Sequence, residues 1–118
     1  MEIEKLKGVH PHLCKVVEES LKRIPFKITE GLRTYQRQQQ LFKEKKTRTL
    51  NSRHLTGHAV DVAALVDGKV SWDFPHYQKI AAVMKEVASE YNIPIVWGGD
   101  WKTFVDGPHF ELDRKKYP

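Results

Sequence analysis

Residues 52–61 (SRHLTGHAVD) run directly into the apolar segment 62–66 (VAALV). A short run of small and β-branched apolar side chains is typical of a buried strand, so we expect a strand over residues 59–66. The glycine at position 57 lets the preceding loop fold back, which brings His54 toward the start of this strand. The stretch therefore predicts that polar ligand groups meet at the mouth of a buried strand.

Side chains on a strand alternate between its two faces. On the strand expected over residues 59–66, Asp61 shares a face with Ala59 and Ala63, whose small side chains would leave room for a metal ion and a substrate. The valines at 60 and 62 point to the other face, toward a core. We therefore expect Asp61 to face a site.

A second histidine segment, residues 106–111 (DGPHFE), lies near the end of the sequence. If it forms a strand, His109 and Glu111 share one face of it. Two strands that direct ligands into one cleft, together with the preceding loop, bring three ligands together: His54, Asp61 and His109. A catalytic zinc ion takes three protein ligands and keeps a fourth position for water, so the pattern predicts a Zn²⁺ site.

The remaining segments predict helices mixed with short strands. Apolar residues at helical spacing predict the helices, with Thr34 and Asp73 as caps of two of them. Residues 1–8 are expected to be a loose start, 47–58 a polar loop and 113–118 a polar tail. The expected helices are 11–24, 35–46 and 74–91, and the expected strands are 26–29, 59–66, 70–72, 95–97 and 108–112. Helices and strands follow one another without βαβ regularity, which predicts an α+β fold.

The composition is that of an ordinary globular domain, with 118 residues of which 40% are hydrophobic and 30% charged, and we expect one domain over residues 1–118. Cys14 is the single cysteine, which excludes an intramolecular disulfide and a thiolate zinc cluster. No window approaches the ~20 apolar residues of a membrane span, and the first residues lack the apolar segment of a secretory signal. The net charge of +5 favours a polyanionic partner or serves solubility alone.

Three motifs in this order carry a resemblance. The first is S-R-H-x-x-G-x-A-x-D at residues 52–61, the second is WGGDW at 97–101, and the third is D-x-x-H-F-E at 106–111. Together they resemble the family of zinc peptidases that act on bacterial cell walls. That family comprises D-alanyl-D-alanine carboxypeptidases and dipeptidases, and L-alanyl-D-glutamate endopeptidases of bacteriophages. The resemblance covers residues 28 to 111 and implies a small α+β domain with an antiparallel sheet that carries the site.

The resemblance also implies roles for individual residues. His54, Asp61 and His109 match the zinc ligands, and Asp106 matches the catalytic base. Many members have glutamate at that position, so the shorter aspartate would need a slightly different reach. Arg33 matches an arginine that binds the substrate or polarises its carbonyl group.

Each of these roles has a simpler alternative. Asp106 begins an Asp-Gly-Pro turn and could merely bond nearby backbone, in which case Glu111 is the reserve candidate for the base. Arg33 could form a surface salt bridge worth ~0–1 kcal/mol. Its guanidinium would otherwise suit a free carboxylate on the residue that follows the scissile bond. That residue is D-glutamate in the endopeptidase substrate and the terminal D-alanine in the carboxypeptidase substrate.

Three other residues in these motifs are further candidates for the site: His58, Trp97 and Trp101. His58 lies four residues after His54, but the glutamate of a helical His-Glu-x-x-His site is missing and Gly57 disfavours a helix. We therefore expect His58 to be structural, or to contact a ligand without binding the metal itself. Trp97 and Trp101 could wall the cleft, although core packing explains Trp97 equally well.

The function that this reading favours is a zinc-dependent peptidoglycan hydrolase that cleaves stem peptides between L-alanine and D-glutamate, as a phage endolysin does. We expect a monomer without a separate wall-binding domain, held in the host cytoplasm until the membrane is permeabilised. The alternatives are a D-alanyl-D-alanine carboxypeptidase and a noncatalytic zinc-containing wall-binding module. A nucleic-acid-binding protein ranks last, because the basic residues are scattered among acidic ones.

Overall fold

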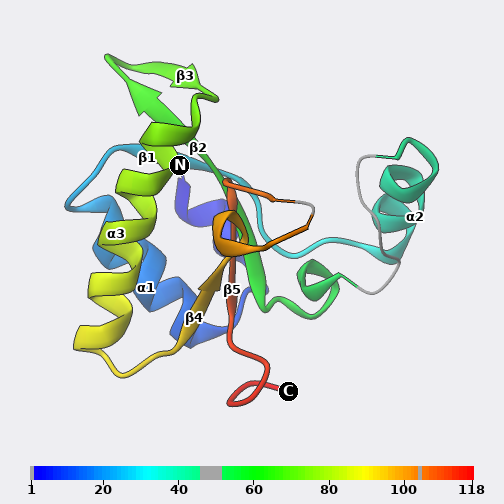
Figure 1. Ribbon diagram of the computed structural model, residues 1–118. Helices are drawn as coiled ribbons and strands as arrows, with labels where there is room; N and C mark the ends of the chain where they lie inside the picture. The colour runs from blue at the N-terminus through cyan, green and yellow to red at the C-terminus, as the bar shows by residue number, and fades with distance from the viewer. Residues whose placement is uncertain (1, 46–51, 104) are drawn as a thin grey trace.

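An antiparallel sheet forms the centre of the protein, which is described by a computed structural model over residues 2–45, 52–103 and 105–118. Within this part of the chain the sheet has five strands, with the order β1-β2-β5-β4 and with β3 paired to β2 (Figure 1). The strands are β1 (Phe26–Glu30), β2 (Ala59–Val66), β3 (Lys69–Ser71), β4 (Ile95–Trp97) and β5 (His109–Leu112). The longest strand, β2, therefore lies inside the sheet and pairs with three others.

Two of the three described α-helices pack together against one face of the sheet, and the third stands apart on the other side (Figure 1). The packed pair is α1 and α3, and the separate helix is α2. Their bounds are Pro11–Leu21 for α1, Tyr35–Lys43 for α2 and Phe74–Glu90 for α3. Short 3₁₀ helices cover Glu2–Leu6, Arg53–Thr56 and Gly98–Asp100. This arrangement confirms the predicted α+β fold with an antiparallel sheet.

The local signals for helix ends were partly correct. The hydroxyl of Thr34 accepts a hydrogen bond from the Arg37 amide at 3.1 Å, as predicted for the cap of α2. Asp73 occupies the cap position of α3, but its side chain makes no capping hydrogen bond. Helix α1 starts at a proline, and its free amides are capped by the His10 side chain, which accepts from the His12 amide at 3.0 Å.

Some predicted boundaries were wrong. The helix expected over 11–24 ends at Leu21, because Arg23 and Ile24 donate their amides to the Ser20 carbonyl in a closing turn. The expected loose start contains a 3₁₀ helix whose Leu6 is buried in the core. The loop expected over 47–58 contains the 3₁₀ helix Arg53–Thr56, while residues 47–51 lie outside the described part of the chain.

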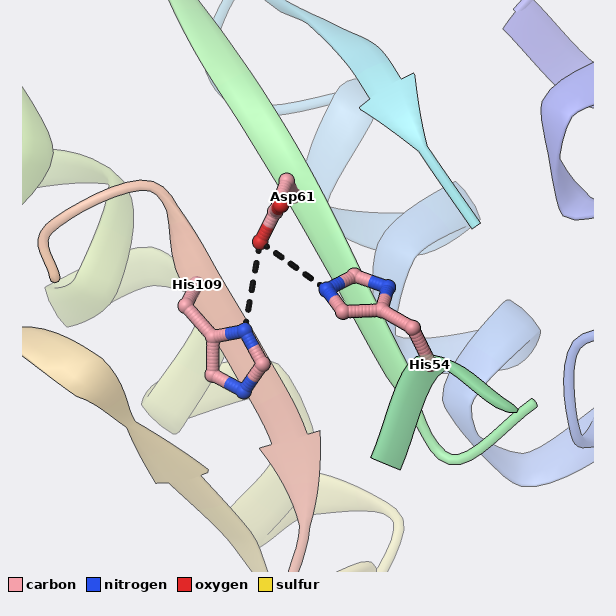
Figure 2. Close-up of side chains that lie close together, drawn as sticks. All are labelled: His54, Asp61 and His109. Atoms are coloured by element: carbon pink, nitrogen blue, oxygen red, sulfur yellow. Dashed lines mark hydrogen bonds and ion pairs between the residues drawn. The ribbon is translucent and has the colours of Figure 1, made fainter. Parts of the chain in front are cut away.

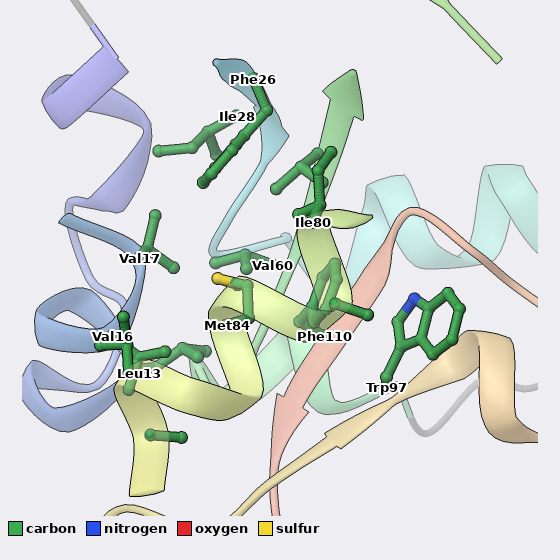
Figure 3. Packing of buried hydrophobic residues seen from close by; sticks show 14 of the residues in the cluster. Leu13, Val16, Val17, Phe26, Ile28, Val60, Ile80, Met84, Trp97 and Phe110 are labelled. Atoms are coloured by element: carbon green, nitrogen blue, oxygen red, sulfur yellow. The ribbon is translucent and has the colours of Figure 1, made fainter. Parts of the chain in front are cut away.

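The hydrophobic core fills the space between the sheet and the pair α1 and α3 (Figure 3). Strands and helices contribute alternating or helically spaced side chains, each of which stabilises the fold by roughly 1.5–3 kcal/mol when fully buried. Among the core side chains are Leu13, Val16, Val17, Phe26, Ile28, Val60, Ile80, Met84 and Phe110. The core thus anchors one face of β2 and β5, the two strands whose other face carries Asp61 and His109.

None of the described helices is long and apolar enough to cross a membrane.

Replacement of Met84 by alanine tests this core. Met84 is fully buried on α3, so Met84→Ala should lower the free energy of unfolding by about 2–5 kcal/mol. Lys79→Ala, on the exposed side of the same helix, should change it by less than about 0.5 kcal/mol. Urea denaturation followed by circular dichroism measures both. Equal effects of the two substitutions would contradict the packing described here.

Candidate metal centre

The pairing of β2 with β5 brings together two of the predicted ligands. Asp61 lies opposite His109 in the antiparallel register, and directly opposed residues have neighbouring side chains. The His109 Nδ1 atom is 3.2 Å from Asp61 Oδ1 (Figure 2). Residues 48 positions apart in the sequence are thus held side by side by main-chain hydrogen bonds rather than by a flexible loop.

His54 reaches the same carboxylate from the 3₁₀ helix Arg53–Thr56. The Ser52 hydroxyl caps this short helix by accepting from the His54 amide at 3.1 Å, and Gly57 ends it with φ 75°. A Cβ atom at position 57 would lie 2.3 Å from the Gly8 carbonyl oxygen. Both this close approach and the positive φ therefore require glycine at this position. The His54 Nε2 atom is 3.2 Å from Asp61 Oδ1.

The orientation of the His54 ring suits a cation. Its Nδ1 atom lies 2.9 Å from the Gly31 carbonyl oxygen, to which it can only donate, so Nδ1 carries the proton. The Nε2 atom then presents a lone pair toward Asp61, whose oxygen is also an acceptor, and this buried nitrogen makes no hydrogen bond. Two acceptors that face each other in a buried site are satisfied by a positive ion between them.

Three ligand atoms meet at this point, one each from His54, Asp61 and His109, and all lie within 4.8 Å of one another. Burial disfavours the ionised form of Asp61, but its close contacts with the His109 and His54 rings outweigh that cost and hold its pKa well below the usual range. Burial likewise lowers the pKa of His109, yet the bonds to Asp61 and Glu111 outweigh this and raise it to about 9. The group is therefore a candidate metal site with an ionised carboxylate at its centre.

Asp106 lies on a closed loop beside this group. Its amide donates to the Gly98 carbonyl at 3.0 Å, and its carbonyl accepts from the His109 amide at 3.2 Å. A side chain at Gly98 would lie 2.3 Å from the Asp106 carbonyl oxygen, so glycine permits this close approach. The Trp97 indole donates to the Gly107 carbonyl at 2.7 Å and braces the same loop.

The carboxyl group of Asp106 is half-buried and within electrostatic range of the metal-site residues. Burial raises its pKa, and the negative charge of Asp61 raises it further, while His109 and His54 partly oppose the shift. The two aspartates of the site thus differ, since Asp61 is held ionised and Asp106 binds a proton more readily. Such a pair is suited to separate ligand and proton-transfer roles.

Arg33 is buried rather than exposed, so the surface salt bridge considered from the sequence is wrong. Its guanidinium binds both oxygens of Glu30, at 2.8 and 2.7 Å, and donates to Gln38 Oε1 at 2.6 Å. It also lies 3.5 Å from Asp61 Oδ2, which is the oxygen that does not face the histidines. Gln38 of α2 is fully buried and takes part in this network.

The other aromatic and histidine candidates separate clearly. Trp97 is buried and stacks between Phe74 and Phe110, with ring centroids 5.6 and 6.3 Å away, so the core-packing alternative holds. Trp101 is half-buried, and its ring centroid lies 5.1 Å from that of His109, which makes it a wall of the site. His58 bonds to the Thr56 hydroxyl at 2.6 Å and lies outside the three-ligand group.

Two residues of the site received no definite role from the sequence. Glu111 was only a reserve base, and it proves to be buried with Oε1 2.8 Å from His109 Nε2. Arg53 belonged to the quoted motif without an assigned role, and it lies 3.8 Å from Glu111 while its Nη2 donates to the Leu112 carbonyl at 3.3 Å. Arg53 is adjacent to His54 in the sequence, and Glu111 is two residues after His109. This proximity is the one feature of the sequence that could have indicated a role for them in the site.

The antiparallel α+β fold and the His-Asp-His group, in which both histidines are buried, place this protein in the class of candidate metallopeptidase domains. The model of the phage L-alanyl-D-glutamate peptidase family matches residues 1–115, and the chain belongs to this family. This confirms the resemblance inferred from the motifs.

Individual relatives support the same assignment. The chain is 32% identical over 110 residues to the peptidoglycan L-alanyl-D-glutamate endopeptidase CwlK of Bacillus subtilis, covering 77% of this chain and 62% of that protein. It is 29% identical over 120 residues to the L-alanyl-D-glutamate peptidase of Escherichia phage T5, covering 97% and 87%. The crystal structure of the Serratia marcescens L-Ala D-Glu endopeptidase ChiX is similar with a TM-score of 0.94 and 46% identity, over 99% of this chain and 90% of that one. The chain thus spans less than two thirds of the Bacillus protein and most of the other two.

Substitution of single ligands tests the metal centre. The variants His54→Ala, Asp61→Ala and His109→Ala each remove one candidate ligand. Loss of a side chain that only hydrogen-bonds to a ligand lowers metal affinity by roughly 10–100-fold, so each of these variants should weaken zinc binding by more than that. His58→Ala is the matched control, because this histidine is in the same segment but outside the group. Competition with a chromogenic chelator measures the affinities. Strong loss of zinc in the His58 variant would contradict the ligand set.

Proposed function

We propose that this protein is a zinc-dependent peptidoglycan hydrolase that cleaves the bond between L-alanine and D-glutamate in stem peptides, as a phage endolysin. The observation that carries the proposal is the convergence of His54, Asp61 and His109 beside Asp106 in a chain of this peptidase family. Each relative described above is named for the same bond.

We propose zinc as the metal, held by His54, Asp61 and His109. Two imidazoles and one carboxylate are ligands that zinc accepts, and three protein ligands are the number found in catalytic sites. When bound, zinc supplies Lewis acidity that polarises a carbonyl group and lowers the pKa of a water molecule to about 7. The lone pair of the buried His54 Nε2 atom supports this assignment.

Asp106 is proposed as the base. It would accept a proton from the attacking water and deliver the proton to the leaving amine of D-glutamate. Its raised pKa, caused by burial and by the charge of Asp61, favours the first step, because a carboxylate that is too acidic is a poor proton acceptor. The closed loop that carries it limits its movement relative to His109.

Arg33 is proposed to act on the substrate through its positive charge. The residue that follows the scissile bond carries a free α-carboxylate, which matches a guanidinium in charge and shape. The same charge beside Asp61 would also stabilise negative charge that develops on the carbonyl oxygen. Glu30 and Gln38 hold the guanidinium in one orientation, so little ordering remains to be done when substrate binds.

The route to the wall is also a proposal. Release from the host cytoplasm after membrane permeabilisation would bring a protein of net charge +5 to an anionic polymer. The charge is distributed over the chain, so attraction to the wall needs no dedicated binding segment.

Mass spectrometry of defined muropeptides tests the reaction. Zinc-loaded protein should release a peptide that begins at D-glutamate, and chelator treatment should abolish the release. Loss of only a terminal D-alanine would instead identify a carboxypeptidase. Intact muropeptides with zinc bound would contradict catalysis and favour the noncatalytic module.

Asp106→Asn tests the proposed base. The amide has the shape of the carboxyl group but cannot take up the proton, so kcat/KM on muropeptides should fall by about 10²–10⁴-fold. Zinc affinity should remain within a few-fold of the original, because Asp106 is outside the ligand group. Asp113→Asn, near the end of the chain, is the matched control. Unchanged hydrolysis by Asp106→Asn would exclude this residue as the base.

Salt dependence tests the contribution of charge to wall binding. At an ionic strength of 0.01 M the Debye length is about 30 Å, and at 1 M it is about 3 Å. Binding of the protein to purified walls should therefore weaken steeply with added salt, as measured by co-sedimentation. Binding that does not respond to salt would remove the electrostatic argument.

A further inference from the structure

Glu111 lies behind His109, on the side of the imidazole ring that faces away from Asp61. Glu111 Oε1 is 2.8 Å from His109 Nε2, while His109 Nδ1 is 3.2 Å from Asp61 Oδ1. Figure 2 shows one ring nitrogen of His109 turned to Asp61 and the other turned away from it. The ring is therefore held between two carboxylates, one on each nitrogen.

This contact selects the tautomer of the ring. A neutral imidazole has one N–H group and one lone pair, and an ionised carboxylate can only accept a hydrogen bond. When a metal ion displaces the proton on Nδ1 and Nε2 still donates to Glu111, the lone pair is on Nδ1, which is the atom that faces Asp61. Glu111 thus directs the lone pair of His109 into the three-ligand group.

The carboxylate of Glu111 is itself fixed. It is on β5 opposite Ala59 of β2, whose small side chain leaves space on that face, and it is only 6% exposed. Its second oxygen, Oε2, lies 3.8 Å from Arg53 Nε and 3.6 Å from Arg114 Nε. The two oxygens of Glu111 thus have separate partners: Oε1 contacts His109, and Oε2 lies near the two arginines.

We propose that Glu111 is a positioning residue for the metal, and that Arg53 holds the Glu111 carboxylate against His109. The inference rests on the proposed metal centre but not on peptide hydrolysis. Because Glu111 contacts the far side of the ligand ring, it acts through His109 and does not touch the reacting atoms. This position favours the positioning role over the reserve role as base.

Glu111→Gln tests the proposal, since it removes the charge and keeps the shape. Zinc affinity, measured by chelator competition, should fall by roughly 10–100-fold, as is usual when an outer partner of a ligand is lost. Glu90→Gln is the matched control, because Glu90 also pairs with an arginine, at 2.8 Å, but on the exposed surface. It should bind zinc like the unmodified protein.

Long-range ¹H–¹⁵N NMR of the zinc-loaded protein supplies a readout that a purely structural role would not change. In the unmodified protein the His109 signals should report a protonated Nε2 and a metal-bound Nδ1. In Glu111→Gln the Nε2 proton should exchange faster with solvent and its signal should shift. Wild-type zinc affinity together with unchanged His109 signals would overturn the proposal.

Glu111→Asp keeps the experiment decisive if the glutamine variant does not fold. It retains negative charge near Arg53 and Arg114 but withdraws the oxygen from His109, so zinc affinity should again fall. Full affinity in this variant would overturn the proposal. Neither readout depends on muropeptide cleavage, so failure of the proposed hydrolysis would be seen separately.

Discussion

The register between β2 and β5 is the constraint on which the site depends. It sets Asp61 opposite His109, and because side chains alternate along a strand, a slip of one residue would turn His109 to the other face and bring Phe110 into its place. Phe110 is fully buried in the core, so such a slip would also expose a large apolar side chain. The hydrophobic core and the metal site are therefore specified by the same pairing.

Buried polar groups surround this pairing, and several of them have a partner that offsets the cost of burial. His54 donates to a main-chain carbonyl, His109 to Glu111, and Arg33 to Glu30 and Gln38. A half-satisfied network in this environment would be costly, since an unpaired buried polar group loses its hydration without replacement. The one ligand nitrogen that makes no hydrogen bond, His54 Nε2, is the atom that points into the proposed metal position.

Two aspartates with opposite electrostatic environments give the site its chemical asymmetry. Both histidine rings lie 3.2 Å from Asp61 Oδ1, and these contacts keep the pKa of Asp61 low despite burial. Burial raises the pKa of Asp106, and the nearby negative charge of Asp61 raises it further. The same residue type can thus serve as ligand in one place and as proton carrier in the other, because the neighbours differ.

The sequence by itself determined the strand 59–66, the three candidate ligands and the family. These depend on local patterns: apolar residues at strand spacing, a glycine where the chain must turn, and histidines at fixed distances from carboxylates. The contact between Glu111 and His109, the burial of Arg33 and Gln38, the packing of Leu6 and the brace of Trp97 on the Gly107 carbonyl were decided only by the tertiary structure. Those features depend on which side chains from distant segments meet. The strand pairing that brings these segments together cannot be inferred from the local sequence pattern of any one segment.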